Sequence, residues 1–457
     1  MGEKAFRLCF YQILVLLFCI QPVFAFEDFV CPIGFDCPVE ILPKVEFLTK
    51  IYAEFHDHQV VFGDTRDPSM IYHVADENAL GRQITCRDTY SRKYGRKIPD
   101  PLKIQIQQLI LQAVDELRIN QATSTLLLYR PEVLAKKLLQ LPDEELSLDH
   151  ITCFHGRADK MREGIIRYQQ YRPMIEQKLK KAGLPDELKY LPFIESAYNP
   201  HAGSKASAVG LWQFIPETGR IFGLTINSTI DERKDPEKST DAAIAFFLKW
   251  NQCFENGQCS SWPFTLTSYN YGPYGMVKAA NYANYDYVYM IENYDGKRFG
   301  SDVRGYYPSF LAATHVFSSI EKHFGQNYAS ILPVPTGTLT IEQTYFAHEI
   351  AHQLCLDLEI LKALNPQFSK EIWSHNRKIA ANSQIYIPLP ILDSDVDELG
   401  ELSISYRVQF DPMPIIPIQS IPLRTQMNQE PIKPNAKLTP SQEKQSKGLL
   451  YFFKKLF

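Results

Sequence analysis

A single acidic residue on an apolar helix face is the first candidate for chemistry in this chain. Four residues follow one another at steps of three, four and three: Leu188, Leu191, Glu195 and Tyr198. On a helix this spacing places them on one face. A carboxylate there is costly unless it is neutralised or given a task, and burial raises a carboxyl pKa toward the range of a useful proton donor. Glu195 is therefore either an acid catalyst or a structural partner of Arg220 or Lys205.

The segments that follow favour the catalytic interpretation. Residues 195–200 read Glu-Ser-Ala-Tyr-Asn-Pro, and small residues then recur, which lets chain segments approach closely. Gln213 is an amide among apolar neighbours, so it needs a partner from the backbone or from a ligand. Tyr269 and Asn270 lie just before a Gly-Pro turn. One acid, one amide and several aromatic rings suit a groove for an uncharged polymer such as a glycan.

Other carboxylates downstream could serve as a second acid or base: Glu217, Asp231, Glu232 and Asp235. Acids at helix starts and in turns commonly cap backbone N–H groups or pair with arginine. We therefore interpret this group as caps or as partners of Arg220 and Arg233, and we expect one catalytic carboxylate.

A competing pattern occurs at residues 348–352, which read His-Glu-Ile-Ala-His. On a helix, His348 and His352 would face one way and could bind zinc, with Glu349 as the base of a peptidase. No third histidine follows at the spacing of the extended zinc motif, although Glu371 could supply a ligand. The apolar residues around the pattern fit the inner face of a short helix, so we predict a structural role and no bound metal.

The elements that must position these residues are mainly helical. Apolar periodicity, prolines and glycines predict helices near Trp212 and at residues 102–117, 131–141, 157–182, 185–198, 240–252, 274–281 and 307–324. Pro192 should bend the helix that carries Glu195. We expect one compact α domain at residues 161–325, preceded by a mostly helical accessory region at 26–160.

The chain changes character after residue 335. Residues 336–390 predict strand, helix, helix and strand, in that order, at Thr338–Ile341, Ala347–Leu354, Asp357–Leu364 and Gln384–Pro388. Residues 391–457 are polar and rich in proline, which disfavours a packed domain. The apolar C-terminal end, residues 448–457, carries two lysines. It could contact a membrane surface peripherally, or it could form a short helix on the body.

The first 25 residues have the pattern of a secretory signal peptide. Lys4 and Arg7 precede an apolar run at residues 8–20, and a cleavage site follows Ala25. Cys19 lacks the small residues expected before a lipidated cysteine. We therefore expect a soluble exported protein.

Composition and cysteines agree with that expectation. The 457 residues are 45% hydrophobic and 22% charged, and the net charge of −4 gives no basic surface for nucleic acid. Two pairs of cysteines, each six residues apart, could close loops in an oxidising compartment: Cys31 with Cys37, and Cys253 with Cys259. Of the other three, Cys86, Cys153 and Cys355 cannot all pair with one another.

Several short blocks occur in a fixed order: Arg162–Tyr171, Gly183–Pro192, Glu195–Ser196, Gly210–Gln213, Asp231–Pro236, Tyr269–Asn270 and Tyr306–Pro308. Together they resemble the lytic transglycosylases with a lysozyme-like (SLT) catalytic domain, and most closely the membrane-bound murein branch designated D. The resemblance spans about a third of the chain. Residues 336–390 separately resemble a divergent LysM module, a small glycan-binding β-α-α-β fold, through the Leu-Asn-Pro stretch ending at Pro366 and the Ile-Pro pair ending at Pro388.

The resemblance implies a role for each matching residue. Glu195 would be the catalytic acid and then the base. The substrate-binding positions of the family fall on Ser204, Gln213, Tyr269, Asn270 and Tyr306, with Tyr307 as the alternative to Tyr306.

The implied reaction is non-hydrolytic cleavage between N-acetylmuramic acid and N-acetylglucosamine in peptidoglycan. It needs no cofactor and no second carboxylate, because the C6 hydroxyl of the sugar itself closes a 1,6-anhydro ring. The expected partner is the glycan strand, and the expected location is the periplasm, at the cell wall or outer membrane. The alternatives are a hydrolytic muramidase, a zinc peptidase at His348 and His352, and a glycan-binding protein without activity.

Overall fold

A computed structural model describes residues 29–86, 89–91, 96–119, 129, 131–142, 146–255, 262–325, 336–388 and 404–406. Met1–Cys31 and Pro32–Phe457 are separate units, and every helix and strand named below lies in the second. The predicted signal peptide and most of the predicted tail lie outside the described residues. Among the helices of the described ranges, none combines the length and the apolar character needed to cross a membrane.

Helices make up the central part of the chain, as predicted. They are α6 (Ala158–Ala182), a 3-10 turn η5 (Asp186–Tyr190), α7 (Leu191–Ser196), α8 (Pro216–Ile221), α9 (Pro236–Glu255), α10 (Trp262–Tyr271), α11 (Pro273–Tyr282), α12 (Tyr287–Asn293), α13 (Ser301–Arg304), α14 (Tyr306–Ser318) and α15 (Ile320–Phe324). The helix predicted near Trp212 lies downstream of it, at α8. Gly183 ends α6 with a left-handed φ of 67°, which a residue without a side chain adopts without strain.

The accessory region contains helices and also strands that the sequence analysis did not assign. A three-stranded antiparallel sheet has the order β2-β1-β5, from β1 (Gln59–Asp64), β2 (Ile71–Asp76) and β5 (Ile151–His155). A hairpin joins β3 (Thr89–Ser91) to β4 (Arg96–Ile98), and the helices are α2 (Leu42–Ala53), α3 (Glu77–Leu80), α4 (Pro101–Arg118) and α5 (Pro131–Leu138), with 3-10 turns at Val39–Ile41 and Leu148–His150. Phe62 of the sheet and Ile106 and Ile110 of α4 share one apolar core.

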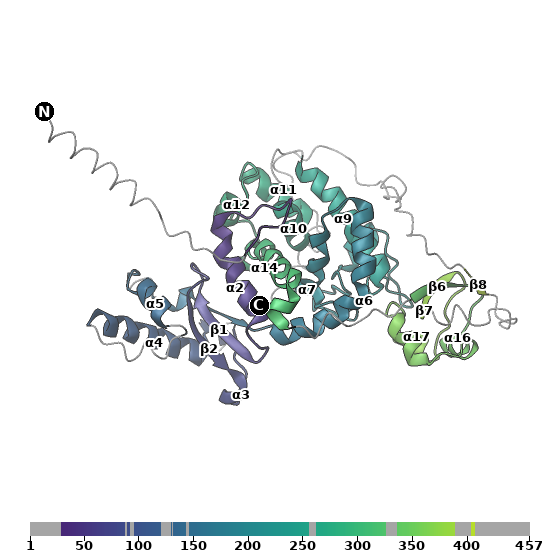
Figure 1. The fold of residues 1–457 in the computed structure, drawn as a ribbon, viewed down its shortest axis with the longest axis horizontal. Helices are drawn as coiled ribbons and strands as arrows, with labels where there is room; N and C mark the ends of the chain where they lie inside the picture. Colours follow the sequence, from purple (N-terminus) through teal and green to yellow (C-terminus); the bar gives the residue numbers. More distant parts are fainter. Residues whose placement is uncertain are drawn as a thin grey trace. The chain divides into compact units, whose positions relative to one another are not determined.

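Helix α2 packs against α14 of the central helices (Figure 1). Its inner side is apolar, because Val45, Leu48 and Tyr52 are fully buried. Tyr307 of α14 also donates a hydrogen bond to the backbone oxygen of Asp36, 2.6 Å away. Helix α2 lies in the predicted accessory region (26–160), whereas α14, on which it packs, lies in the predicted central domain (161–325).

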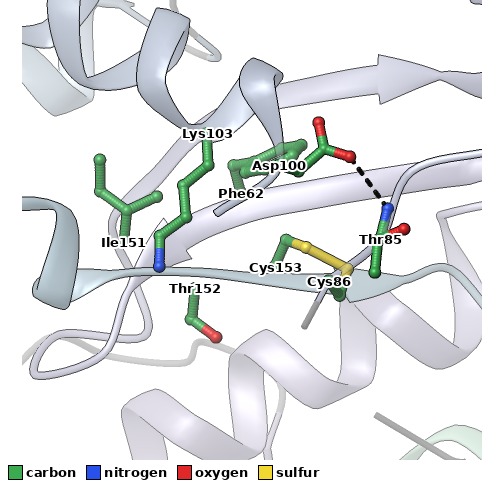
Figure 2. Close-up of a pocket in the computed structure, with 8 residues that line it drawn as sticks. All are labelled: Phe62, Thr85, Cys86, Asp100, Lys103, Ile151, Thr152 and Cys153. Atoms are coloured by element: carbon green, nitrogen blue, oxygen red, sulfur yellow. Dashed lines mark hydrogen bonds between the residues drawn. A yellow bond between two sulfur atoms is a disulfide. The ribbon is translucent and has the colours of Figure 1, made fainter. Parts of the chain in front are cut away.

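A disulfide fixes the sheet of the accessory region. Cys86 is bonded to Cys153 of β5, 67 residues away. The bond borders a pocket of about 150 Å³, in which Lys103 and Asp100 lie near Thr152 and Thr85 (Figure 2). The Asp100 carboxylate accepts the N–H of Thr85 at 3.2 Å.

The remaining cysteines only partly follow the predicted pairing. Cys31 and Cys37 are both disulfide-bonded. The prediction for Cys253 is wrong, since its thiol is free; Cys259 lies outside the described residues. Cys355 is also free.

The C-terminal module contains the predicted strand, two helices and strand, with an additional helix before the second strand and an additional strand after it. Strands β6 (Thr336–Ile341), β7 (Ser383–Pro388) and β8 (Ile404–Tyr406) form an antiparallel sheet in the order β7-β6-β8. The helices are α16 (Ala347–Gln353), α17 (Leu358–Leu364) and α18 (Lys370–Trp373). Strand β8 falls within the segment predicted to lack packed structure. It pairs with β6, so at least these three residues of that segment belong to the module.

Candidate active site

Glu195 lies in the last turn of the short helix α7. The sequence analysis predicted one bent helix here, but the chain forms the 3-10 turn η5 and then starts α7 anew. Pro192 occupies the second position of α7, where its missing N–H costs no intrahelical hydrogen bond. Leu188, Leu191 and Tyr198 are fully buried with Glu195, as their spacing predicted.

The chain turns sharply after Glu195, and neighbouring segments hold the turn. Ala197 and Tyr198 both have left-handed φ values, 48° and 58°. Residues with a side chain adopt this backbone conformation only rarely. Ser196 donates from Oγ to the backbone oxygen of Leu211 at 2.8 Å, and Arg167 donates from Nε to that of Ala197 at 2.9 Å. These contacts fix the direction in which the Glu195 side chain leaves the helix.

Burial keeps the Glu195 carboxyl protonated near neutral pH. The residue is 5% exposed, and burial raises its pKa to about 8, against the smaller opposing effects of the Tyr306 hydrogen bond and the Arg157 charge. The hydroxyl of Tyr306 donates to a carboxylate oxygen of Glu195. The predicted structural partner Arg220 instead donates to the backbone oxygen of Ile226. Such an environment is that of a general acid.

Two residues that sequence reasoning missed lie behind this carboxyl group. Arg157, at the N-cap of α6, and Tyr52, on α2, are both buried. The guanidinium carbon of Arg157 lies 5.8 Å from the centre of the Tyr52 ring. The Arg157 charge lowers the pKa of Glu195, and the Glu195 charge raises that of Tyr52. Neither residue stands in a recognisable motif, so only the packing of α2 and α6 reveals them.

The amides of the site are partly satisfied by the backbone. Gln213 donates from Nε2 to the backbone oxygens of Gly210 and Ala202, at 2.7 and 3.1 Å. Its Oε1 and the Nδ2 of Asn270 are buried, and neither has a hydrogen-bond partner within the described ranges. One acceptor and one donor are therefore left for another molecule.

Tyr269 and Ser204 make local contacts that shape the site. The Tyr269 hydroxyl donates to the backbone oxygen of Trp212 at 2.6 Å, and the Glu195 charge helps to raise the tyrosine pKa. The Ser204 hydroxyl accepts the N–H of Ala208 at 3.0 Å, which closes its own loop. Of the predicted substrate-binding residues, Tyr306 alone has a hydrogen bond to Glu195 that the structure records.

Three of the other candidate carboxylates have structural partners. Asp231 forms a two-point ion pair with Arg233, with oxygen–nitrogen distances of 2.8 and 2.7 Å. Glu232 accepts the N–H of Thr225 at 2.6 Å. Asp235 caps α9 by accepting the N–H of Glu237 at 2.9 Å. The fourth carboxylate, Glu217, lies in the first turn of α8 and is exposed.

Arg233 ties the loop that carries Ser204 and Gln213 to the C-terminal module. It donates to the backbone oxygens of Ser207 and Phe214, at 2.6 and 3.1 Å. A Cβ atom at position 210 would lie 1.7 Å from the backbone oxygen of Arg233, so only glycine fits there.

On the module side, the N–H of Asp231 donates to the backbone oxygen of Gln367 at 2.8 Å. Tyr386 of β7 donates to the Asp235 carboxylate at 2.9 Å. The module is therefore packed directly against the segment that supports the loop.

Tyr306 and its neighbour Tyr307 allow a matched test of the acid. Replacing Tyr306 with Phe removes a donor that stabilises the ionised carboxylate, so the Glu195 pKa should rise above about 8. On the expectation that the protonated form of Glu195 starts the reaction, wild-type activity should fall as pH rises above about 8, and this decline should move to higher pH in the variant. A hydrogen bond to a charged group is worth roughly 1.5–3 kcal/mol, which predicts an activity loss of about tenfold or more.

The matched control is Tyr307→Phe, which loses a hydroxyl bonded to Asp36. It should keep the wild-type pH profile. A Tyr306→Phe profile that stays in place, or moves to lower pH, would contradict the assignment.

The His-Glu-x-x-His pattern lies on the surface of the C-terminal module. His348, Glu349 and His352 of α16 are exposed. The Glu349 carboxylate accepts the N–H of Phe346 at 2.8 Å, and so caps the helix that carries it. Within the described ranges, no group of three or more potential ligands is placed to hold a metal ion.

A double substitution tests that interpretation. His348→Ala with His352→Ala should leave glycan cleavage unchanged, because both side chains are exposed and exposed substitutions change stability by only about 0.5 kcal/mol. The purified protein should contain less than stoichiometric zinc. Bound zinc in a metal analysis, or a peptidase activity that a chelator abolishes, would overturn the structural interpretation.

Part of the central helices matches a known class of domain. Residues 172–287 match the family profile of the transglycosylase SLT domain. Over 114 residues the chain is 40% identical to membrane-bound lytic murein transglycosylase D of Escherichia coli strain K12. Over 139 residues it is 27% identical to membrane-bound lytic murein transglycosylase C of Actinobacillus pleuropneumoniae.

These matches cover limited parts of each protein. The alignment with transglycosylase D covers 25% of this chain and 24% of that relative, and the alignment with transglycosylase C covers 28% and 37%. The chain thus spans about a quarter of the length of the first relative. A solved structure of an inactive mutant of lytic transglycosylase Slt from Pseudomonas aeruginosa aligns with 55% of this chain and 41% of its own, at 16% identity and a TM-score of 0.28.

Proposed function

We propose that this protein is a peptidoglycan lytic transglycosylase with Glu195 as its single acid and base. The observation that carries the proposal is the buried Glu195 carboxyl group, which lies within the residues that match the SLT profile and accepts a hydrogen bond from Tyr306. Burial raises its pKa to about 8. The structural partners of Asp231, Glu232 and Asp235 support a mechanism that needs no second carboxylate.

In the proposed reaction, Glu195 gives its proton to the leaving glycosidic oxygen between N-acetylmuramic acid and N-acetylglucosamine. The carboxylate that results is stabilised by the Tyr306 hydroxyl. It then accepts the proton of the C6 hydroxyl of the muramic sugar, whose oxygen attacks the anomeric carbon and closes a 1,6-anhydro ring. Positioned proton transfer contributes about 10²–10⁴-fold, and holding the internal hydroxyl near the reacting carbon contributes further.

We propose roles for the neighbouring residues on the same basis. The unsatisfied Oε1 of Gln213 and Nδ2 of Asn270 offer an acceptor and a donor that suit the amide and hydroxyl groups of amino sugars. Tyr269 and Ser204 shape the groove, and residues 336–388 act as a LysM-like glycan-binding module. The signal-peptide pattern at residues 1–25 supports export to the periplasm, where the substrate is found.

Digestion of purified peptidoglycan with the exported form of the protein tests the proposal. Soluble fragments with cut glycan strands and intact peptide stems are expected. Cut stems with intact glycan would instead support a peptidase, and binding without any release of fragments would support an inactive glycan-binding protein.

A further inference from the structure

Two exposed tyrosines pair on the surface formed by α11 and α12. Tyr282, the last residue of α11, is 52% exposed, and Tyr289 of α12 is 47% exposed. Their ring centres are 6.1 Å apart, with 24° between the ring planes. Among the exposed large apolar side chains of the described ranges, these two alone are aromatic. Exposed rings that gather at one place commonly mark a binding surface.

Local contacts hold the Tyr282 ring and the backbone of Tyr289 in place. The Tyr282 ring packs against that of Tyr294, with 5.3 Å between the ring centres. The N–H of Tyr289 donates to the capping Asp286 carboxylate at 2.9 Å, and its backbone oxygen accepts from Asn293 Nδ2 at 3.0 Å. A ligand that stacks on the Tyr282 ring therefore restricts little side-chain freedom there, which favours binding.

A series of aromatic contacts links this pair to the candidate active site. The ring centres of Tyr294 and Phe299 are 5.1 Å apart, and those of Phe299 and Tyr271 are also 5.1 Å apart. Tyr271 directly follows Tyr269 and Asn270 in α10. Helix α11 in turn packs against both α10 and α12. The exposed pair is thus continuous with the helix that supplies two of the predicted substrate-binding residues.

The surroundings of the pair suit an uncharged polar polymer. Charged residues near the pair are few and of mixed sign: Lys278 lies on α11 with Tyr282, Glu292 lies on α12 with Tyr289, and Asp286 is used as a helix cap. Two exposed amides, Asn281 and Asn284, flank Tyr282. Pyranose rings present flat C–H faces that stack on aromatic rings, and their hydroxyl and acetamido groups hydrogen-bond to amides.

We propose that Tyr282 and Tyr289 form an outer sugar-binding site, which holds the peptidoglycan glycan strand beyond the sugars at the bond that is cut. The proposal rests on the proposed function for the identity of the strand. A glycan is favoured over a second copy of this chain because two rings are far smaller than the roughly 800 Å² per partner of a stable interface. Lys278 is the single basic residue between residues 274 and 296, and one basic side chain also disfavours an anionic membrane surface.

The test measures how binding depends on strand length. The protein carries Glu195→Gln, so that strands stay intact, and its affinity for purified long glycan strands is compared with that for a short two-disaccharide fragment. Without substitutions at the pair, long strands should bind more tightly. The double substitution Tyr282→Ala with Tyr289→Ala should remove most of that difference. The affinity for long strands should fall about tenfold, because two stacking contacts are lost. Tyr282→Phe with Tyr289→Phe keeps the rings and should retain it.

Two controls make the result specific. Ile166→Ala removes another large exposed apolar side chain and should leave the length dependence unchanged, and thermal unfolding should show that every variant is folded. If the double alanine variant binds long strands as well as its parent does, the outer site is wrong while the proposed function stands. A changed oligomeric state without a change in glycan binding would overturn the outer sugar-binding site and would indicate self-association of the protein instead. Failure of the parent to bind any glycan would overturn both proposals.

Discussion

Glu195→Gln is expected to abolish glycan cleavage while leaving the fold and glycan binding intact. Glutamine keeps the shape of the side chain and can still accept the hydrogen bond from Tyr306, but it can neither donate nor retrieve a proton. Loss of a positioned acid and base should cost at least about 10²–10⁴-fold in rate. Release of soluble fragments from purified peptidoglycan measures the rate, and co-sedimentation with the insoluble polymer measures binding.

The matched control is Glu217→Gln, which removes an exposed carboxylate from the first turn of α8. This variant should retain wild-type turnover. Turnover above a few per cent in Glu195→Gln would rule out Glu195 as the catalytic acid. A parallel loss of activity in the control would point instead to a second catalytic carboxylate.

The periodicity and the helix-ending residues predicted α6, α9, α11 and α14 of the central helices, but not α10, which carries Tyr269 and Asn270, nor α12 or α13. The range predicted as 157–182 is α6 at Ala158–Ala182, because Gly183 provides a clear end. The strand–helix–helix–strand order after residue 335 was also predicted, since short apolar runs alternate there with turn residues. Glu195 could be singled out because its charge interrupts an apolar face, which is a signal local to one helix.

Features that depend on packing between distant segments could not be predicted in this way. Strands β1 and β2 are close in sequence, but β5 follows β2 only after about 75 residues of chain and then pairs with β1, and local patterns do not specify such distant pairing. Tyr52 and Arg157 come near Glu195 through the packing of α2 against α14 and α6, which no local pattern specifies. The choice between Tyr306 and Tyr307 was likewise open until the orientation of α14 placed the first on Glu195 and the second on Asp36.

The chemistry of the product depends on what attacks the anomeric carbon. A hydrolase needs a second group to activate water or to attack directly. The downstream carboxylates Asp231 and Asp235 already bond to Arg233 and to the start of α9. The internal C6 hydroxyl should therefore prevail over water, and nearly all new ends should carry the anhydro ring.

The most direct measurement is the mass of the fragments released from purified peptidoglycan, before and after treatment with borohydride. Lytic transglycosylation predicts muramic ends that are one water lighter than those of a hydrolase and that borohydride cannot reduce. Heavier, reducible ends would contradict the account. They would show that water attacks, and that one of the downstream carboxylates, Glu217, Asp231, Glu232 or Asp235, activates it.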